Sequence, residues 1–380
     1  MNIAIVCYPT FGGSGVLATE LGKVLADKGH NIHFITYQQP VRLSHYHANI
    51  FYHEVRVPTY PLFDFPPYET ALASTMVDVV KNNNIDLLHV HYAIPHASAA
   101  YMAKQILQTE GRNIPFITTL HGTDITLVGR DKTYSPVVTF SMEESDILTA
   151  VSHNLKEETY RNFSITKPIE VIHNFVDIDR FNKKPVDAFK KLIAPNGEKI
   201  IVHASNFRAV KRVKDVVEVF VRLQKKVPAK LLLIGDGPER PEIEDFTRSC
   251  SACGEIKFLG KQEQMEDILP IADLFLLPSE YESFGLAALE AMAAEVPVIS
   301  SNAGGLPEIN ENGFSGFLCN VGDVADMSEK AIEILSEEQT HKRFKQQAFL
   351  QAQKFGIENI VPQYEALYER LVGISKSKYG

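Results

Sequence analysis

Hydrophobic residues in this chain fall in short runs that alternate with amphipathic stretches of helical spacing. A short apolar run of this kind predicts a buried strand, and apolar residues three or four apart predict a helix that covers a sheet. Strand and helix in regular alternation indicate a parallel sheet with helices on both faces. In the first half, strands are predicted over 2–7, 31–37, 50–57, 85–90, 115–120 and 147–151, and helices over 16–29, 68–82, 95–109, 133–145 and 153–162.

The alternation loses its regularity near residues 175–190 and then begins again. A chain of 380 residues also suits two domains better than one. We therefore predict an α/β protein with two Rossmann-like, doubly wound domains, 1–175 and 176–356, that bind ligands at the carboxyl ends of their strands and face each other across a cleft. A final helix over about 357–374 is expected to pack back on the first domain. The second series of strands is predicted at 199–204, 230–234, 255–259, 273–277, 296–300 and 316–319.

Composition narrows the classes of function. The formal net charge of −9 argues against a general nucleic-acid binder and against a strongly basic membrane-surface protein. No apolar run reaches the ~18 residues of a spanning helix, and no basic leader precedes the first apolar run. We expect a cytoplasmic protein without stable membrane insertion, and we leave a homo-oligomer open.

Cysteine and histidine give little sign of redox or metal chemistry. Cys250 and Cys253 form a lone C-x-x-C, expected in the tail of a helix that begins after Pro238, which is not a redox position. The histidines near His89 lack the acids and the spacing of a metal site, so we expect no metal, and we expect His89 to be buried in a strand. The remaining cysteines are Cys7 and Cys319.

The stretch Pro278–Met292 carries the strongest chemical signal. An apolar run over 272–277 leads into a Ser-Phe-Gly turn, and strong helix formers follow over 286–294. Free amides and the positive end of a helix dipole make such a turn a phosphate site. Glu282 and Glu290 would repel phosphate, so they should reach past it to hydroxyls, as a sugar nucleotide offers. The alternative is an ordinary helix-end acid and a solvated helix acid.

Two more turns follow strands of the second half. Arg208 and Lys211 stand beside a predicted helix start, an unfavourable place for cations unless an anion such as a diphosphate joins them. A solvated basic turn is the alternative. The turn Gly235–Pro238 either lines a flat base or only reverses the chain.

Three features of the first half lie at strand ends. Gly13, Gly15 and Ala18 fit the loose dinucleotide fingerprint, but residues 35–39 lack the acid that would hold a ribose, which argues against a nicotinamide enzyme. Amides of this turn can still approach a phosphate or carboxylate. Tyr92 and His121 also follow strands, where a site role and a structural role are equally open.

Together these motifs resemble the retaining glycosyltransferases of family four, which have the two-domain GT-B fold, over nearly the whole chain. The resemblance implies transfer of N-acetylglucosamine from UDP-N-acetylglucosamine to the hydroxyl of L-malate, the first step of bacillithiol biosynthesis; this narrower point leans on His91–His96. It also implies no catalytic metal and no other cofactor. The motifs are Gly12–Gly15, His121–Asp124, Ser205–Arg208 with Lys211, Gly235–Pro238, and Glu282–Glu290.

The resemblance assigns roles residue by residue. It implies that Glu290 holds the ribose, that Glu282 meets hydroxyls of the donor sugar, and that Arg208 and Lys211 hold the diphosphate. No carboxylate need act as a nucleophile. The catalytic set is His121, Arg208, Lys211 and Glu282, and the donor set is Gly15, Ser205, Asn206, Arg208, Lys211, Gly235, Glu282, Ser283, Phe284, Gly285, Leu286 and Glu290.

The acceptor set is a hypothesis from position and charge. The two carboxylates of malate need donors from the first domain. Two other functions stay open: a family-four transferase with a lipid or polysaccharide acceptor, and a non-catalytic sensor of sugar nucleotides. The candidate acceptor residues are Gly13, Ser14, Tyr92, Thr119, His121, Arg130 and Asn154.

Overall fold

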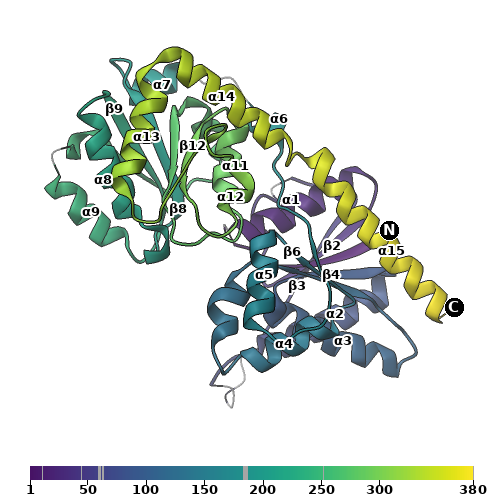
Figure 1. Cartoon of the computed structure of the whole chain (residues 1–380). Coiled ribbons are helices and arrows are strands. Elements are labelled where there is room, and N and C mark those ends of the chain that lie inside the picture. Colours follow the sequence, from purple (N-terminus) through teal and green to yellow (C-terminus); the bar gives the residue numbers. More distant parts are fainter. Residues whose placement is uncertain are drawn as a thin grey trace. The chain divides into compact units, whose positions relative to one another are not determined.

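The chain divides into two compact units, each described here by itself (Figure 1). Unit 1 comprises Met1–Asn174 with Glu358–Gly380, and unit 2 comprises Phe175–Ile357. The computed structural model describes the chain except for residues 11, 44, 59, 60, 62, 63, 183–186, 251 and 380, and except for the side chains of residues 127, 130, 187 and 375–379.

Unit 1 is built on a seven-stranded sheet in which every described strand pair is parallel. The strand order is β3-β2-β1-β4-β5-β6-β7, so the chain starts in the middle and reverses direction between β1 and β4. In the register, Ile5 lies opposite Phe34 on one side and His89 on the other. The strands are β1 (Asn2–Val6), β2 (Asn31–Thr36), β3 (Ile50–Glu54), β4 (Leu87–His91), β5 (Phe116–Leu120), β6 (Ile147–Ala150) and β7 (Ile169–Val171).

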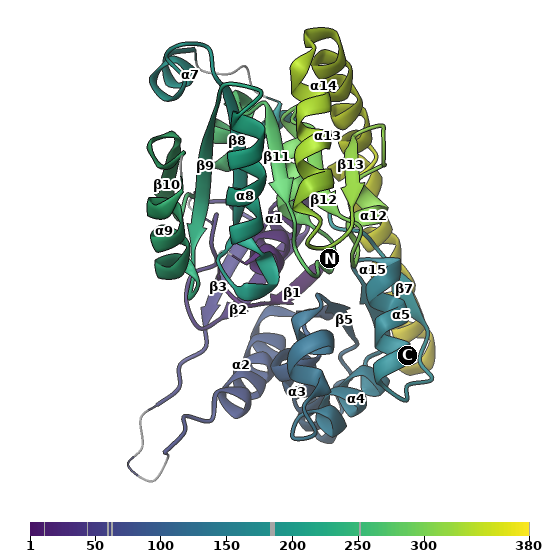
Figure 2. The same ribbon diagram turned by 60° about the vertical axis from the view of Figure 1, so that its left-hand side comes forward.

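Helices cover this sheet, and α2, α3 and α4 pack in sequence beside one another (Figure 2). The last helix, α15, is amphipathic and buries Tyr364 and Tyr368 completely. The helices of unit 1 are α1 (Gly13–Asp27), α2 (Tyr68–Asn83), α3 (Ser98–Thr109), α4 (Ser135–Glu144), α5 (His153–Asn162) and α15 (Ile357–Tyr379), with short helical turns at Ala93–Ala97, Thr123–Leu127 and Val128–Arg130.

Unit 2 repeats the design with a six-stranded parallel sheet of order β10-β9-β8-β11-β12-β13. Its strands are β8 (Lys199–Asn206), β9 (Ala229–Asp236), β10 (Ile256–Gly260), β11 (Leu274–Leu277), β12 (Val298–Ser301) and β13 (Gly316–Cys319). Its helices are α6 (Ile178–Phe181), α7 (Asp187–Ile193), α8 (Val213–Gln224), α9 (Arg240–Ser249), α10 (Met265–Ile268), α11 (Leu286–Ala293), α12 (Leu306–Ile309), α13 (Val324–Ser336) and α14 (Glu338–Gln353). Short helical turns lie at Ala209–Lys211, Cys253–Glu255 and Leu269–Ile271.

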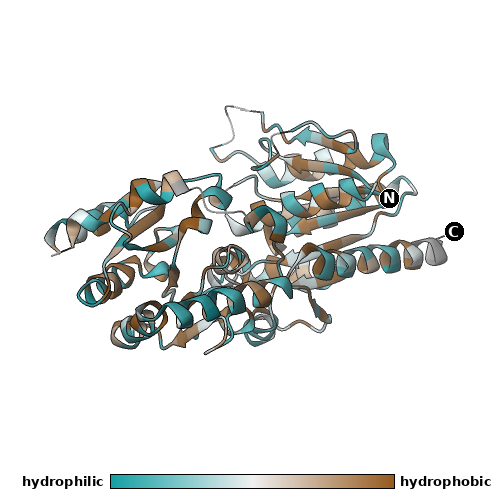
Figure 3. Cartoon of the chain, turned by 90° about the horizontal axis from the view of Figure 1, so that it is seen from above, coloured by the Kyte–Doolittle hydropathy of each residue, from teal (hydrophilic) through white to brown (hydrophobic). Residues whose placement is uncertain are grey.

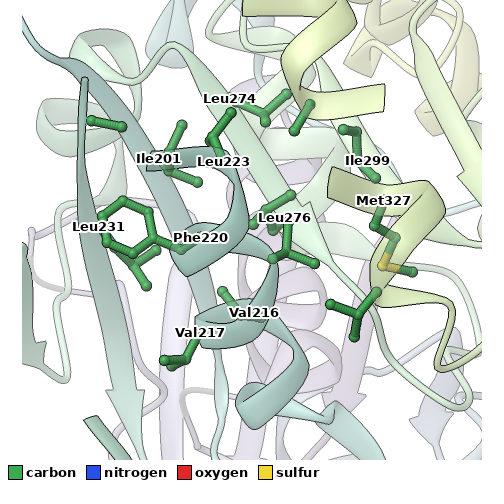
Figure 4. Packing of buried hydrophobic residues seen from close by; sticks show 14 of the residues in the cluster. Ile201, Val216, Val217, Phe220, Leu223, Leu231, Leu274, Leu276, Ile299 and Met327 are labelled. Atoms are coloured by element: carbon green, nitrogen blue, oxygen red, sulfur yellow. The ribbon is translucent and has the colours of Figure 1, made fainter. Parts of the chain in front are cut away.

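The core of unit 2 shows why the apolar pattern gives this arrangement. Apolar residues of α8, among them Phe220, point at the sheet and meet Leu231 and Leu276 (Figure 4). Met327 of α13 lies in the same cluster. Full burial of each such side chain contributes roughly 1.5–3 kcal/mol. The helices carry both hydrophobic and hydrophilic residues, as helices with one covered face do (Figure 3).

The predicted α/β class with two doubly wound parallel sheets is confirmed. The strand β7 was not predicted, because its three residues are too few for a pattern. The placing of the C-x-x-C pair was wrong: α9 ends at Ser249, so Cys250 follows the helix and Cys253 begins a separate turn. Among the described helices, none combines the length and the apolar character that crossing a membrane requires.

Candidate functional site

The carboxyl end of the sheet in unit 2 brings Lys211 and Glu282 together. The Nζ atom of Lys211 lies 2.6 Å from Oε1 of Glu282, and the hydroxyl of Ser279 donates to the same oxygen at 2.8 Å. The two charged side chains are 18% and 14% exposed. A backbone hydrogen bond of 2.8 Å from Glu280 to Val210 joins the loop after β8 to the loop after β11. The two loops are therefore joined at this edge of the sheet, and the charge of Lys211 is paired with that of Glu282.

Arg208 differs from Lys211 because its side chain has no partner among the described residues. Its side chain is exposed and makes no ion pair or hydrogen bond with any residue that the structure describes. It precedes the short helical turn Ala209–Lys211, with α8 beginning shortly after. A lone guanidinium near a helix start is unfavourable with the dipole, and an anion bound there would reverse this.

Glycines of the next loop hold Glu282 in place. Gly304 has a φ of 61°, and a Cβ atom there would lie 2.1 Å from the carbonyl oxygen of Glu282. The amide of Gly305 donates to that same carbonyl at 2.7 Å. Sequence reasoning missed both residues, although a Gly-Gly pair separated from the end of β12 by two residues was a signal of close backbone approach.

The helix α11 begins at the predicted glycine turn. Gly285 has a φ of 100°, and a Cβ there would lie 2.6 Å from Leu306. Within the described part of the chain, the amides of Gly285 and Leu286 reach no backbone acceptor, as expected for the first turn of a helix. Glu290, one turn along, is 8% exposed. Of the two turn residues before the helix, Phe284 is buried and Ser283 is half-buried.

The turn after β9 packs on the end of β8. Gly235 has a φ of 124°, and a Cβ there would lie 1.8 Å from the carbonyl oxygen of Ser205. The hydroxyl of Ser205 bonds to Nε2 of His203 at 2.7 Å, while Asn206 is exposed. The positive φ and the close contact with Ser205 therefore explain why a glycine stands at Gly235, independently of any ligand.

In unit 1, the first turn of α1 needs a glycine at Gly15. A Cβ on Gly15 would lie 2.4 Å from the carbonyl oxygen of Tyr8, so no larger residue fits. Gly15 is buried, whereas Gly13 is exposed and Ser14 is half-buried. The amides of Gly13 and Ser14 have no backbone acceptor among the described residues. These two amides are the groups of this turn that an anion can reach.

Tyr92 joins this turn to the end of β4. Its phenol oxygen lies 2.6 Å from the hydroxyl oxygen of Ser14, in a hydrogen bond. Its backbone has a φ of 84°, and its amide donates to the carbonyl of Thr119 at 2.9 Å. Burial raises the pKa of Tyr92. The phenol is therefore neutral near pH 7.

His121, at the end of β5, is paired with a second histidine. Its Nε2 atom lies 2.7 Å from Nδ1 of His91. Burial lowers the pKa of His121 to about 3, so the ring is neutral near pH 7. Asp124 accepts from the amides of Ala93 and Gly122, both at 3.0 Å, and so ties the loop after β4 to the loop after β5. Sequence reasoning gave this aspartate no role.

The other predicted residues of unit 1 differ in accessibility. Thr119 is buried, and its hydroxyl lies 2.8 Å from Nε2 of His89 and 2.7 Å from the hydroxyl of Thr149. His89 is fully buried, as expected. Asn154 is half-buried in the first turn of α5. Arg130 was also predicted to bind the acceptor, but its side chain is not among those that the structure describes.

Two family models match this chain, each over a different range of residues. The model described as Glycosyltransferase Family 4 matches residues 11–180, and the model described as Glycosyl transferases group 1 matches residues 186–351. The chain is 46% identical over 370 residues to N-acetyl-alpha-D-glucosaminyl L-malate synthase of Bacillus anthracis, with 97% of this chain and 96% of the relative covered.

Solved structures share the fold at lower identity. Sucrose-phosphate synthase from Thermosynechococcus elongatus has a TM-score of 0.80 at 23% identity, with 98% of this chain and 100% of that chain covered. HepE from Anabaena, solved in complex with UDP-glucose, has a TM-score of 0.81 at 19% identity, with the same coverage. Both likenesses support the GT-B fold. On the identity and coverage of the Bacillus anthracis relative, this chain belongs to glycosyltransferase family four.

Proposed function

We propose that this enzyme is a retaining glycosyltransferase that moves N-acetylglucosamine from UDP-N-acetylglucosamine to the hydroxyl of L-malate. The product is N-acetyl-α-D-glucosaminyl L-malate, and the reaction is the first step of bacillithiol biosynthesis. The observation that carries this proposal is the 46% identity, over nearly the full length of both chains, to a synthase named for that product. A cytoplasmic location stays a prediction.

The donor would bind in unit 2, with its diphosphate at Arg208 and Lys211. The exposed guanidinium of Arg208 and the amides of Gly285 and Leu286 offer donors for phosphate oxygens. Glu290 would accept hydrogen bonds from the ribose hydroxyls. Ser205, Asn206, Gly235, Ser283 and Phe284 would line the remainder of the donor site.

Glu282 is suited to hold the donor sugar. Its Oε1 atom is occupied by Lys211 and Ser279. Its Oε2 atom accepts no hydrogen bond from the described residues, so one carboxylate oxygen is available to sugar hydroxyls. With a sugar held by Glu282, the ion pair would bring the ammonium group of Lys211 near the sugar end of the donor, where charge on the leaving phosphate develops.

The proposed chemistry needs no protein nucleophile. The bond between the anomeric carbon and the UDP oxygen breaks through an oxocarbenium-like state, and the malate hydroxyl attacks on the same face. A phosphate oxygen of the departing UDP takes the hydroxyl proton, so configuration is retained and charges balance. Arg208 and Lys211 would stabilise the charge that UDP gains. Glu282 therefore differs from the second carboxylate of a retaining glycosidase.

The acceptor would bind in unit 1. The amides of Gly13 and Ser14, the linked hydroxyls of Ser14 and Tyr92, and Asn154 offer donors for the two malate carboxylates. Thr119, buried between His89 and Thr149, would support this site rather than touch the acceptor. Arg130 is kept as a candidate on its charge and position.

The test is a panel of acceptors. The full-length protein is incubated with UDP-N-acetylglucosamine and L-malate, D-malate, succinate, a lipid acceptor or a polysaccharide acceptor, and UDP release is followed. We expect release with L-malate and none with succinate, which lacks the hydroxyl. Release only with the lipid or the polysaccharide would favour a different family-four activity, and donor binding without release on any acceptor would favour a sensor.

A further inference from the structure

Three histidine rings form a column at the carboxyl ends of β4 and β5. The rings of His89 and His91 are stacked with centroids 4.5 Å apart, whereas those of His91 and His121 meet edge to edge through their nitrogens, with centroids 5.0 Å apart and planes 26° apart. His89 and His91 are fully buried, and His121 is 9% exposed. Of these three rings, only His121 is accessible enough to touch a substrate.

The neighbouring His96 shows how such a ring is protonated here. Its Nδ1 atom is hydrogen-bonded to the carbonyl oxygen of His91. A carbonyl only accepts, so Nδ1 of His96 carries the hydrogen. The other nitrogen, Nε2, is buried and has no partner among the described residues. In His96, the Nε2 atom therefore carries a lone pair and no hydrogen.

His91 also has a buried nitrogen without a partner among the described residues, but here either of the two bonded rings could be the donor. Its Nε2 atom is also buried without a partner in the described part of the chain, and its Nδ1 atom lies 2.7 Å from Nε2 of His121. Burial lowers the pKa of both rings, so each carries one hydrogen. If His121 donated, the hydrogen of His91 would have to sit on the buried Nε2 atom as an orphaned donor, which native proteins rarely contain.

We infer that Nδ1 of His91 donates to Nε2 of His121, so that His91 is a positioning residue that fixes His121 in the tautomer with its hydrogen on Nδ1. That Nδ1 atom has no hydrogen-bond partner among the described residues, and it is not one of the buried unpaired atoms. His121 therefore offers an N–H donor to solvent or substrate. It presents no lone pair with which to take a proton.

The tautomer of His121 follows from its contacts, whereas its role in the reaction rests on the proposed function. Within that function, His121 donates a hydrogen bond to an oxygen of the donor or acceptor, such as a hydroxyl, a carboxylate or a phosphate. It does not act as the general base for the malate hydroxyl, whose proton leaves with UDP. The direction of one hydrogen bond thus decides between two chemical roles for the same ring.

The direct test is the tautomer itself. Full-length protein labelled with ¹⁵N-histidine is examined near neutral pH by long-range ¹H–¹⁵N correlation, with His91→Asn and His121→Asn used to assign the two rings. We expect both His91 and His121 to carry their hydrogen on Nδ1. A hydrogen on Nε2 of either ring would overturn the inference. Because no substrate is present, failure of the proposed function leaves this result unaffected.

A matched pair of variants gives a kinetic test. The amide of His91→Asn can stand near the position of Nδ1, whereas that of His91→Gln stands near Nε2. We expect His91→Asn to keep most of the activity and His91→Gln to lower kcat by about tenfold, the effect of one lost hydrogen bond. KM for UDP-N-acetylglucosamine should change little. Equal kcat values in the two variants would contradict the inference.

Discussion

The ammonium group of Lys211 lies 2.6 Å from a carboxylate oxygen of Glu282, which is 71 residues away in the chain. Removing the lysine leaves a mostly buried carboxylate without its counter-charge and, in the proposed mechanism, takes a cation from the leaving phosphate. We expect Lys211→Ala to lower kcat/KM for UDP-N-acetylglucosamine by about 10²–10³-fold. Steady-state kinetics at saturating L-malate measure this change.

A matched control for that variant is Lys214→Ala. Lys214 also pairs with a glutamate, Glu242, but both side chains are largely exposed, at 40% and 60%. Exposed pairs contribute about 0–1 kcal/mol, so this variant should keep wild-type kinetics. Similar losses in the two variants would mean that the pair with Glu282 has no special role.

Gly304 tests the support of Glu282 by the loop after β12. A Cβ at this residue would meet the carbonyl oxygen of Glu282 at 2.1 Å, and its φ of 61° disfavours other residues. We expect Gly304→Ala to displace Glu282 and to lower kcat/KM by about tenfold or more. Gly254→Ala, at an open position of the same unit, is the control. If the two variants behave alike, close packing at Gly304 does not matter for the site.

The hydrogen bond of 2.6 Å between Ser14 and Tyr92 marks the proposed malate site. We expect the combined Ser14→Ala, Tyr92→Phe and Asn154→Ala variant to raise KM for L-malate by about tenfold or more, because several donors are lost. KM for UDP-N-acetylglucosamine should stay within twofold, roughly the spread of neutral surface changes. Tyr46→Phe, at a side chain that is 94% exposed, should change neither value. An unchanged malate affinity in the combined variant would remove most support for the acceptor set.

Stability should depend on pH through the buried histidines. Burial lowers the pKa of His33 to about 4, below the ~6.5 of an unfolded chain, and its neighbour His53 is lowered as well, although Asp78 opposes that shift. The unfolded state therefore binds more protons between these values, and the contribution is complete above about pH 6.5 and lost as pH falls towards 4. Asp124, whose pKa burial raises to about 6, acts in the opposite sense.

Urea unfolding at several pH values between about 7 and 5 measures this dependence. We expect the free energy of unfolding of the wild type to fall on acidification. His33→Gln should remove up to about 1.4 kcal/mol per pH unit of that slope. His45→Gln, at an exposed residue, should leave the slope unchanged. A slope that His33→Gln does not alter would show that His33 is not buried in its neutral form.

Strands such as Phe116–Leu120 and Leu274–Leu277 were predictable because they are buried on both faces and read as continuous apolar runs. Short elements escaped, since the three residues of β7 have no visible period. The order of the strands in the sheet could not be predicted from the sequence. The observed order places the ends of β1 and β4 side by side, where Tyr92 reaches Ser14.

Candidate site residues were found where their chemistry conflicts with their local environment. Arg208 beside a helix start and Glu282 in a phosphate-type turn are examples. Residues that act through packing or a hydrogen bond were missed, because partners such as Gly304 for Glu282 and His91 for His121 are defined only by the fold. Ser279 was missed for the same reason, since its hydroxyl reads as an ordinary polar residue until its 2.8 Å bond to Glu282 is known.

The central claim is the transfer of N-acetylglucosamine to L-malate with retention, and the product of that one reaction tests it most directly. The enzyme is incubated with UDP-N-acetylglucosamine and L-malate, and the product is examined by mass spectrometry and by the coupling of its anomeric proton. The account predicts a one-to-one conjugate of the two substrates with an α linkage, formed together with UDP. A β linkage, or the absence of any conjugate while both substrates persist, would contradict it.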